Sequence, residues 1–410
     1  MLYYAHEWFH AAVRPFRTAA AAHRNFLLSP LNPLSYTLGG KAVAAAHEVF
    51  DDLTKRYEKP AFGLDQTTID GTMVNVREVT VEQNPFCDLI HFERDPRAVA
   101  NRNDPRLLVV APLSGHYATL LRGTIETLLP DFEVYLTDWK NAREVPSADG
   151  TFDLDTYVDY VTQFLRTLGA GAHVIGVCQP GVPIMMAVSL MAEDKDPATP
   201  ASMVLMGSPI DTRVNPTQPN DYATGRSLSW FRRHVIQRVP PGYAGAGRLV
   251  YPGFLQLSGF LAMNLDQHVT AYNRQFDNLV AGDGDSAAKH TAFYEEYLSV
   301  MDLTAEYYLQ TVQTVFQEHL LPRGEMVYRG RPVRPAAIAS VALMTIEGEK
   351  DDISGLGQTK AAHDLCVNIP ESKRTHYVQK NVGHYGVFNG RKWRDGIAPR
   401  IAEFVRANGG

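Results

Sequence analysis

The chain contains 410 residues, enough for one large α/β domain with an insertion or for two average domains. Its 45% hydrophobic and 20% charged residues are typical of an ordinary soluble globular protein, and its net charge of −6 gives no electrostatic footprint for nucleic acid. The three cysteines, Cys87, Cys178 and Cys366, lie far apart in the sequence, which argues against a disulfide framework and a cysteine metal site.

Residues 1–70 are predicted to be an N-terminal helical segment, because apolar residues recur at helical spacing over 3–16 and 40–55. Residues 6–10 match the zinc-hydrolase pattern H-E-x-x-H, in which two histidines share one helix face. No third ligand is evident, so we predict a surface helix and no metal. The start has no continuous apolar region, and no run reaches membrane-spanning length; we expect no signal peptide, no transmembrane segment and a cytoplasmic location.

The middle of the chain changes to short buried strands that alternate with helices. Two alternating runs, 72–81 and 88–92, predict an antiparallel pair. Apolar strands are then predicted at 107–111, 134–136, 174–175, 203–206 and 338–346, with a helix over Leu154–Leu168. This alternation predicts the α/β class, with a parallel sheet covered on both faces and ligands bound at the carboxyl ends of its strands.

Residues 211–333 interrupt this alternation and divide the α/β core into residues 71–210 and 334–410. Helical spacing recurs within the segment over 255–265 and 291–321. We interpret the segment as an inserted lid over the active site, with an independent helical domain as the alternative. Four aromatic side chains of the insertion are candidates for an apolar substrate cleft, and simple packing is the alternative for each: Trp230, Tyr243, Tyr251 and Phe254.

Residues 173–181 have the pattern of a nucleophile elbow, in which a sharp turn between a strand and a helix exposes one reactive side chain. A β-branched run leads into Gly176-x-Cys178, and an apolar helix is predicted over 182–192. Pro180 suits the first turn of that helix, although it replaces the usual second glycine of the motif. The helix N-terminus would favour a thiolate at Cys178, whereas the alternative is a small buried hydrophobic residue.

Two further loops supply an acid and a base. Asp351 follows the fifth apolar strand and is the preferred acid; Asp352 is the second choice, and Asp211 a weaker one. His384 lies between glycines after a strand predicted at 375–379, where a core histidine is not expected. The order of nucleophile, acid and base along the chain is that of the α/β-hydrolase fold.

An acyl intermediate on Cys178 requires two hydrogen-bond donors for the developing oxyanion. The first is predicted to be the backbone N–H of Gln179, the residue after the nucleophile. The second should come from the loop after the first parallel strand, from either Leu113 or Ser114. His116 in the same loop either reaches the substrate or has a structural role.

With these residues in place, the sequence resembles the intracellular polyhydroxybutyrate (PHB) depolymerases that use cysteine in place of serine. The resemblance covers nearly the whole chain and rests on G-V-C-Q-P at 176–180, P-L-S-G-H-Y-A-T-L-L-R-G-T at 112–124, Y-P-G-F-L-Q at 251–256, G-E-K-D at 348–351 and G-H-Y-G at 383–386. It implies hydrolysis of poly(3-hydroxybutyrate) at the surface of intracellular granules. The reaction would pass through an acyl-cysteine on a Cys178, Asp351 and His384 triad, with no metal or organic cofactor.

Two alternatives remain beside this resemblance. Polyhydroxyalkanoate synthases are similar in using Cys, Asp and His on the same fold, but they carry G-x-C-x-G, whereas Pro180 stands here at the second glycine. A non-catalytic granule-associated protein is the other alternative, and an intact set of three catalytic residue types argues against it. No oligomeric state is predicted.

Overall fold

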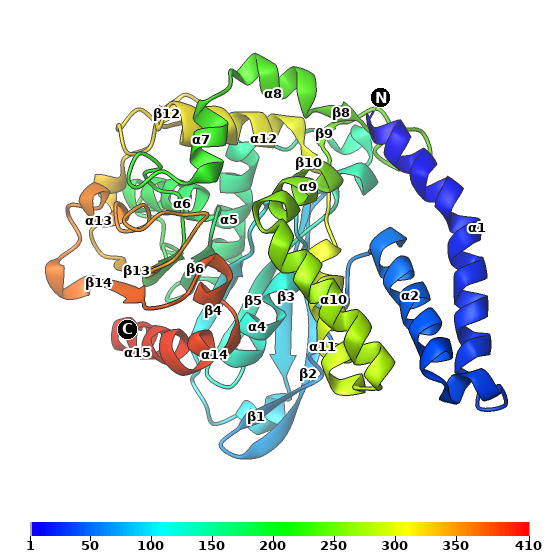
Figure 1. Cartoon of the computed structure of the whole chain (residues 1–410). Helices are drawn as coiled ribbons and strands as arrows, with labels where there is room; N and C mark the ends of the chain where they lie inside the picture. Colours follow the sequence, from blue (N-terminus) through cyan, green and yellow to red (C-terminus); the bar gives the residue numbers. More distant parts are fainter. Residues whose placement is uncertain (1, 410) are drawn as a thin grey trace.

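The computed structural model describes residues 2–409, and a nine-stranded sheet forms its centre (Figure 1). The strand order is β1-β2-β3-β5-β4-β6-β7-β13-β14. The pairings from β1 to β5 are antiparallel and those from β5 to β14 are parallel. The bounds are β1 Gln66–Ile69, β2 Thr72–Gln83, β3 Cys87–Arg94, β4 Arg106–Val110, β5 Glu133–Trp139, β6 His173–Val177, β7 Ser202–Met206, β13 Ala342–Gly348 and β14 Arg374–Gln379.

The predicted antiparallel pair and the parallel strands are confirmed, with bounds that differ by one to four residues. The fifth apolar strand begins at Ala342 rather than at residue 338, because Pro335–Ala337 form a short 3₁₀ turn before it. Every residue of β6, β7 and β13 is buried. Strands buried throughout need covering layers on both faces, which explains their continuous apolar sequences.

Helices of the core connect and cover these strands. α5 has the predicted bounds, Leu154–Leu168, because both ends carry strong signals: the Asp153 side chain accepts a hydrogen bond from the Thr156 N–H at 2.8 Å, and Gly169 follows the last turn with φ 79°. The other core helices are α3 Pro96–Val99, α4 Arg122–Leu128, α6 Gly181–Glu193, α13 Ala362–Leu365, α14 Gly390–Lys392 and α15 Ala398–Asn408.

The predicted insertion lies between β7 and β13, which are neighbours in the sheet although residues 207–341 separate them in the chain. Its helices are α7 Gln218–Thr224, α8 Leu228–His234, α9 Gly253–Met263, α10 Leu265–Ala281, α11 Gly284–Leu298 and α12 Ala305–Thr311, followed by a π-helical turn over Val312–Gln317. It also contains short strands β8 Gln237–Arg238, β9 Leu249–Tyr251, β10 Leu303–Thr304, β11 Val327–Tyr328 and β12 Arg331–Pro332.

Two helices predicted in the insertion are interrupted. The stretch 291–321 is not continuous, because β10 breaks it by pairing with β9. The stretch 255–265 spans the junction of α9 and α10, where Asn264 leaves the helical conformation with φ −132°. Helical spacing continues across both breaks because the flanking helices all pack apolar side chains, so periodicity alone does not locate the breaks.

The N-terminal segment forms a helical hairpin, α1 Leu2–Leu28 and α2 Leu38–Thr54, which stands beside α10 at the right of Figure 1. Two corrections apply to this segment. Residues 66–69 form strand β1, so 1–70 is not helical throughout. The H-E-x-x-H segment is also not a plain surface helix, because the His6 ring stacks on Phe254 with centroids 4.1 Å apart. Glu7 pairs with Arg56 at 2.6 Å.

His6 and His10 are the two histidines of the H-E-x-x-H pattern. The Nε2 atoms of His6 and His10 lie 3.2 Å apart. Within residues 2–409, no group of three or more His, Cys, Asp or Glu side chains is arranged to hold a metal ion. In the same range, no helix combines the length and the apolar composition needed to cross a membrane.

Candidate active site

Cys178 occupies a strained turn directly after β6. Its φ of +68° is uncommon for a residue with a side chain, and its backbone N–H donates to the Met206 carbonyl of the neighbouring strand at 2.7 Å. Gly176 leaves room for the helix that follows, because a Cβ there would lie 2.6 Å from the end of the Ile184 side chain, which would have to shift. The sequence therefore forms the strand, sharp turn and helix of a nucleophile elbow.

The proline in place of the second glycine is compatible with this turn. Pro180 has helical backbone angles, φ −56° and ψ −15°, and α6 begins at the next residue. The close contact instead occurs at Gly181, where a Cβ would lie 2.4 Å from Ser208 Cβ. The small residue that packs against the neighbouring loop is therefore Gly181, one position after the second glycine of the usual motif.

Asp351 and His384 come together at the carboxyl end of the sheet. The His384 Nδ1 lies 2.8 Å and 3.0 Å from the two carboxylate oxygens of Asp351, whose side chain is completely buried. The backbone N–H groups of Ile353 and Ser354 donate to Asp351 Oδ1 at 2.9 Å and 2.8 Å. These bonds fix the carboxylate, which then fixes the orientation of the imidazole ring.

The two other candidate acids lie elsewhere. Asp352 is exposed. Asp211 forms an ion pair with Arg213 at 2.8 Å. Of the three candidate acids, Asp351 is the one that makes hydrogen bonds to His384 in this structure.

His384 and Cys178 line the same cavity. Because Asp351 occupies Nδ1 of the His384 imidazole, Nε2 is the nitrogen left for the Cys178 thiol. Burial is the largest single influence on the His384 pKa and lowers it, but Cys178 and Asp351 together outweigh burial and raise the pKa well above its usual value. The surroundings of His384 thus favour the protonated imidazole.

The remaining two thiols have different surroundings. Cys87 and Cys366 are buried, and burial raises the pKa of Cys87 well above its usual value and that of Cys366 to about 12. Cys178 is half-buried and lines a cavity. Because the thiolate is the reactive form of cysteine, the two buried thiols are poor nucleophiles, and Cys178 is the candidate that the cavity makes accessible.

Gly207 is a site residue that sequence reasoning missed. It follows β7 with φ +54°, and a Cβ there would lie 3.2 Å from His384 Cε1 and 3.3 Å from Asp351 Oδ2. A side chain at this position would crowd the imidazole and carboxylate pair. The available signal was its place immediately after a buried strand, at the same edge of the sheet as Cys178.

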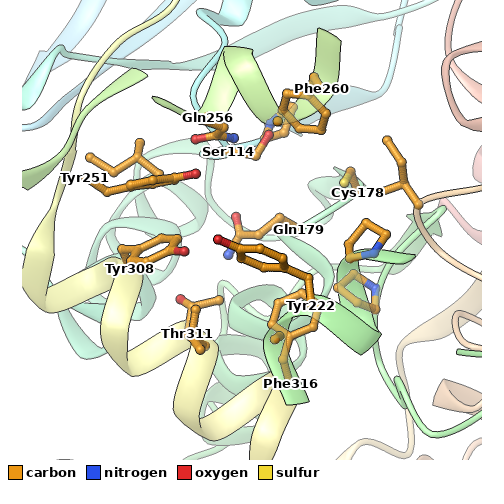
Figure 2. A pocket seen from close by; sticks show the side chains of 18 of the residues that line it. Ser114, Cys178, Gln179, Tyr222, Tyr251, Gln256, Phe260, Tyr308, Thr311 and Phe316 are labelled. Carbon is orange, nitrogen blue, oxygen red and sulfur yellow. The ribbon is translucent and has the colours of Figure 1, made fainter. Parts of the chain in front are cut away.

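A cavity of about 620 Å³ opens beside Cys178 (Figure 2). Core loops form one wall, through Pro112, Leu113, Ser114, Cys178 and His384, and the insertion forms the opposite wall. No Asp, Glu, Lys or Arg side chain is among the residues that line it in the described chain. Such a cavity suits an uncharged, largely apolar ligand.

Most predicted binding residues line this cavity, but two do not. Gln179, Leu113, Ser114, His116, Trp230 and Tyr251 line it. Tyr243 and Phe254 instead pack around Tyr3 of α1, with ring centroids 6.5 Å and 5.6 Å from the Tyr3 ring. The Tyr3 ring that they surround is itself anchored, because its hydroxyl donates to Asp302 at 2.6 Å. Insertion residues that the prediction missed include Tyr222, Phe231, Tyr308 and Phe316.

His116 has a structural contact as well as a place in the wall. Its side chain is 2% exposed, and its Nε2–H donates to the Tyr297 carbonyl at 3.0 Å. Burial lowers the pKa of His116 to about 4, so the ring is neutral. The backbone N–H of Met301 donates to the Gly115 carbonyl at 2.7 Å, and this hydrogen bond links the same loop to the insertion.

Cys178 follows β6, Asp351 follows β13 and His384 follows β14. These positions and the strand order are those of the α/β-hydrolase fold; the order is β2-β3-β5-β4-β6-β7-β13-β14. The chain is therefore an α/β-hydrolase-fold protein with a large, mainly helical insertion after β7. Residues 207–409, which contain the insertion, the acid and the base, match the family described as "PHB de-polymerase C-terminus".

Two curated relatives are both named "Poly(3-hydroxyalkanoate) polymerase subunit PhaC". The protein from Haloferax mediterranei is 24% identical over 378 residues, which cover 86% of this chain and 70% of the relative. That from Haloarcula marismortui is 21% identical over 342 residues, covering 80% and 66%. Among solved structures, a monoacylglycerol lipase from Paleococcus ferrophilus aligns with a TM-score of 0.45 at 13% identity, covering 74% of this chain and 96% of that one.

Proposed function

We propose that this protein hydrolyses ester bonds of poly(3-hydroxybutyrate) through an acyl-cysteine intermediate on Cys178. The observation that carries the proposal is the thiol beside the His384 and Asp351 pair, at the edge of a cavity whose lining contains no Asp, Glu, Lys or Arg side chain. The family that residues 207–409 match is named for depolymerases of this polymer. An ester needs less activation than an amide, because its alkoxide is a better leaving group.

The proposed first step forms a bond between the Cys178 sulfur and the ester carbonyl carbon. The carbonyl electron pair moves to oxygen, where the N–H of Gln179 and an N–H of Leu113 or Ser114 stabilise it. On collapse, the bond from carbon to the alkoxide oxygen breaks, and the alkoxide takes the proton from the His384 imidazolium. The products of this step are a shorter polymer chain with a free hydroxyl and a thioester on Cys178.

In the proposed second step, neutral His384 accepts a proton from water, and the hydroxide attacks the thioester carbonyl. The bond from carbon to sulfur breaks, and the carboxylic acid leaves. The thiolate and the imidazolium are restored. Asp351 remains ionised throughout and keeps the Nδ1–H of the ring oriented toward itself.

Contact with the polymer granule is part of the same proposal. Residues 25–40, at the turn of the N-terminal hairpin, contain no charged residue. Three apolar side chains there are strongly exposed: Leu31 is 94%, Tyr36 73% and Leu38 74% exposed. An uncharged apolar surface is complementary to an uncharged polyester. The expected location in the cell is the cytoplasm, at the surface of PHB granules.

A polymerase is the second candidate, since both curated relatives are named as polymerases. It would transfer the acyl group to a growing chain from a coenzyme A thioester, whose phosphates need cations. The cavity lining contains no Lys or Arg, but Arg232 and Arg233 are exposed on α8, the helix that carries the cavity residue Trp230. A non-catalytic granule protein would need neither the thiol nor its base.

Release of 3-hydroxybutyrate from amorphous polymer granules, without acyl-CoA, tests these alternatives. We expect release by the wild-type protein and none by Cys178→Ala, a loss of at least about 10⁴-fold for a missing nucleophile. The variant should still sediment with granules. Turnover only of 3-hydroxybutyryl-CoA would identify a polymerase, and release by Cys178→Ala would exclude Cys178 as the nucleophile. Granule binding with no turnover of either substrate would identify a coat protein.

A further inference from the structure

His116 lies where the cavity wall formed by core loops meets the wall formed by the insertion. It belongs to the loop after β4, and its backbone pairs with Val300 of the insertion in a single antiparallel bridge. Its ring packs against the rings of Phe260 and Tyr297, with centroids 5.6 Å and 5.5 Å away. His116 is 2% exposed and lines the cavity. These contacts hold the imidazole in one orientation.

The two ring nitrogens of His116 have different roles. Nε2 lies 3.0 Å from the Tyr297 carbonyl oxygen, which can only accept, so Nε2 carries a hydrogen. Burial keeps the ring neutral by lowering its pKa to about 4, so Nδ1 carries no hydrogen and offers a lone pair. Within residues 2–409, Nδ1 has no hydrogen-bond partner and is not among the unpaired polar atoms that are sealed from solvent. His116 therefore presents an open hydrogen-bond acceptor in the cavity wall.

An open acceptor requires a ligand that donates a hydrogen bond. Along a polyester chain every carbonyl and ester oxygen is itself an acceptor, and at neutral pH the carboxylate end is one too. The hydroxyl at the other end of the chain is the donor that such a polymer offers. The aromatic rings of Phe260 and Tyr297 beside the imidazole make these surroundings apolar, which strengthens a hydrogen bond formed there.

The position of His116 places this hydroxyl on the acyl side of the ester that is cleaved. His116 lies in the same loop as Leu113 and Ser114, one of which donates to the carbonyl oxygen in the proposed reaction, and Cys178 lines the same cavity. Figure 2 shows Ser114 and Phe260 on the same side of the cavity. In a poly(3-hydroxyacyl) chain, the carbonyl nearest the hydroxyl end belongs to the unit that bears the hydroxyl. The acyl group on Cys178 and the free hydroxyl are therefore parts of one fragment.

We propose that His116 Nδ1 accepts a hydrogen bond from the terminal hydroxyl of the polyester while an ester near that end lies at Cys178. The inference rests on the proposed function, because its ligand is a poly(3-hydroxyacyl) chain. His116 is then a specificity-determining residue that selects hydroxyl ends over chain interiors, and the products are short hydroxyacids. The selectivity arises because a chain interior leaves the buried acceptor unpaired.

Two linear trimers that differ only at the hydroxyl end test this role. One is the trimer of 3-hydroxybutyrate, and the other ends in a butanoyl unit, which lacks the hydroxyl. We expect the wild-type kcat/KM to be about tenfold higher for the hydroxyl trimer, the effect of one hydrogen bond. Equal values for the two trimers would overturn the inference without any variant.

His116→Phe keeps a planar ring and removes both nitrogens. It should bring the ratio of the two kcat/KM values close to one, whereas damage to the loop alone would lower both values equally and leave the ratio near ten. His268→Phe is the matched control: its ring also contacts the Tyr297 ring, with centroids 5.1 Å apart, but in the described chain His268 is not among the residues that line the cavity. Its ratio should stay near ten. A ratio that stays near ten in His116→Phe would overturn the role of His116.

Binding separates this inference from the proposed hydrolysis. In the Cys178→Ala background, calorimetry should show the hydroxyl trimer binding about tenfold more tightly than the butanoyl trimer, and nearly equal affinities when His116→Phe is added. That result, with no hydrolysis of either trimer by the wild type, would retain the hydroxyl contact and reject depolymerisation. Hydrolysis of both trimers with equal kcat/KM would retain depolymerisation and reject the hydroxyl contact.

Discussion

The two walls of the cavity are built by different parts of the chain and in different ways. The core wall consists of loops that follow β4, β6, β7, β13 and β14, and its key side chains are fixed by short hydrogen bonds such as the 2.8 Å contact between His384 Nδ1 and Asp351 Oδ2. The insertion wall consists mostly of helices α7, α8, α9 and α12 and presents many aromatic rings among aliphatic and uncharged polar side chains. The core wall is built for chemistry, and the insertion wall for the shape and polarity of the ligand.

This difference predicts two classes of variant. Changes in the core wall should lower the rate for every ester, because they disturb groups that act on the reacting carbonyl. Changes in the insertion wall should depend on the ligand, because they remove contacts that only a longer chain can make.

Asp351→Asn should have the largest effect of these. An amide in place of the carboxylate can no longer hold the His384 Nδ1–H or stabilise the imidazolium, and the expected loss in kcat is about 10³–10⁴-fold. Asp352→Asn is the matched control, since Asp352 is exposed, and it should stay within about twofold. Steady-state rates on p-nitrophenyl butanoate and on a linear trimer of 3-hydroxybutyrate check both variants. A larger loss for Asp352→Asn would show that Asp352, and not Asp351, is the acid that orients His384.

Gly207→Ala should lower kcat about tenfold for both esters. The added Cβ would lie 3.2 Å from His384 Cε1 and 3.3 Å from Asp351 Oδ2, so the catalytic pair must shift by a few tenths of an ångström. Gly71→Ala is the control for backbone strain alone: Gly71 also has a positive φ, +80°, but a Cβ there meets nothing within 4 Å. Similar thermal stability of the two variants with unequal kcat would support the prediction. Equal kcat would contradict it.

The same contrast explains how much the sequence could predict. The elbow around Cys178 and the acid Asp351 were predicted because each follows a strand whose apolar run marks its own end, and parallel strands bring those ends to one edge. His384 follows the mostly polar strand β14 and was predicted from its place between two glycines in a loop. Gly207 follows a strand in the same way, but a glycine carries no chemistry that marks it, and its role appears only when the imidazole lies above it.

The insertion wall could not be predicted in this way. Its aromatic residues have helical spacing, but the orientation of each helix depends on distant contacts. Phe254 turns toward α1 because the N-terminus of α9 is held by Asp302, whose Oδ1 accepts from Gly253 N–H at 3.0 Å and whose Oδ2 accepts from Tyr3. Tyr308 and Phe316 face the cavity from a helix interrupted by a π-helical turn. Neither long-range contacts nor a change of helix type is visible in the residue pattern.

The pH dependence of kcat/KM tests the role of the core wall. Cys178 and Asp351 raise the His384 pKa against the lowering effect of burial. The imidazolium needed to protonate the leaving alkoxide therefore persists to higher pH than free imidazole would allow, and the alkaline loss of kcat/KM should lie well above pH 6.5. Asp351→Asn removes one raising influence, so His384 should titrate at lower pH. Nuclear magnetic resonance of the His384 imidazole in resting protein checks this without turnover, and an unchanged titration would contradict it.

Trp230→Ala tests the insertion side, where the smallest effect is expected. The Trp230 ring lines the cavity and stacks on His234 with centroids 4.7 Å apart, so it remains a half-buried, well-packed wall element. Its loss should raise KM for the trimer about three- to tenfold, because a longer chain loses apolar contact area worth about 1 kcal/mol, and should leave p-nitrophenyl butanoate nearly unchanged. Trp8→Ala is the matched control, a tryptophan 73% exposed on α1. If Trp230→Ala lowered kcat equally for both esters, the insertion would take part in positioning the reacting carbonyl, and the division between the two walls would be wrong.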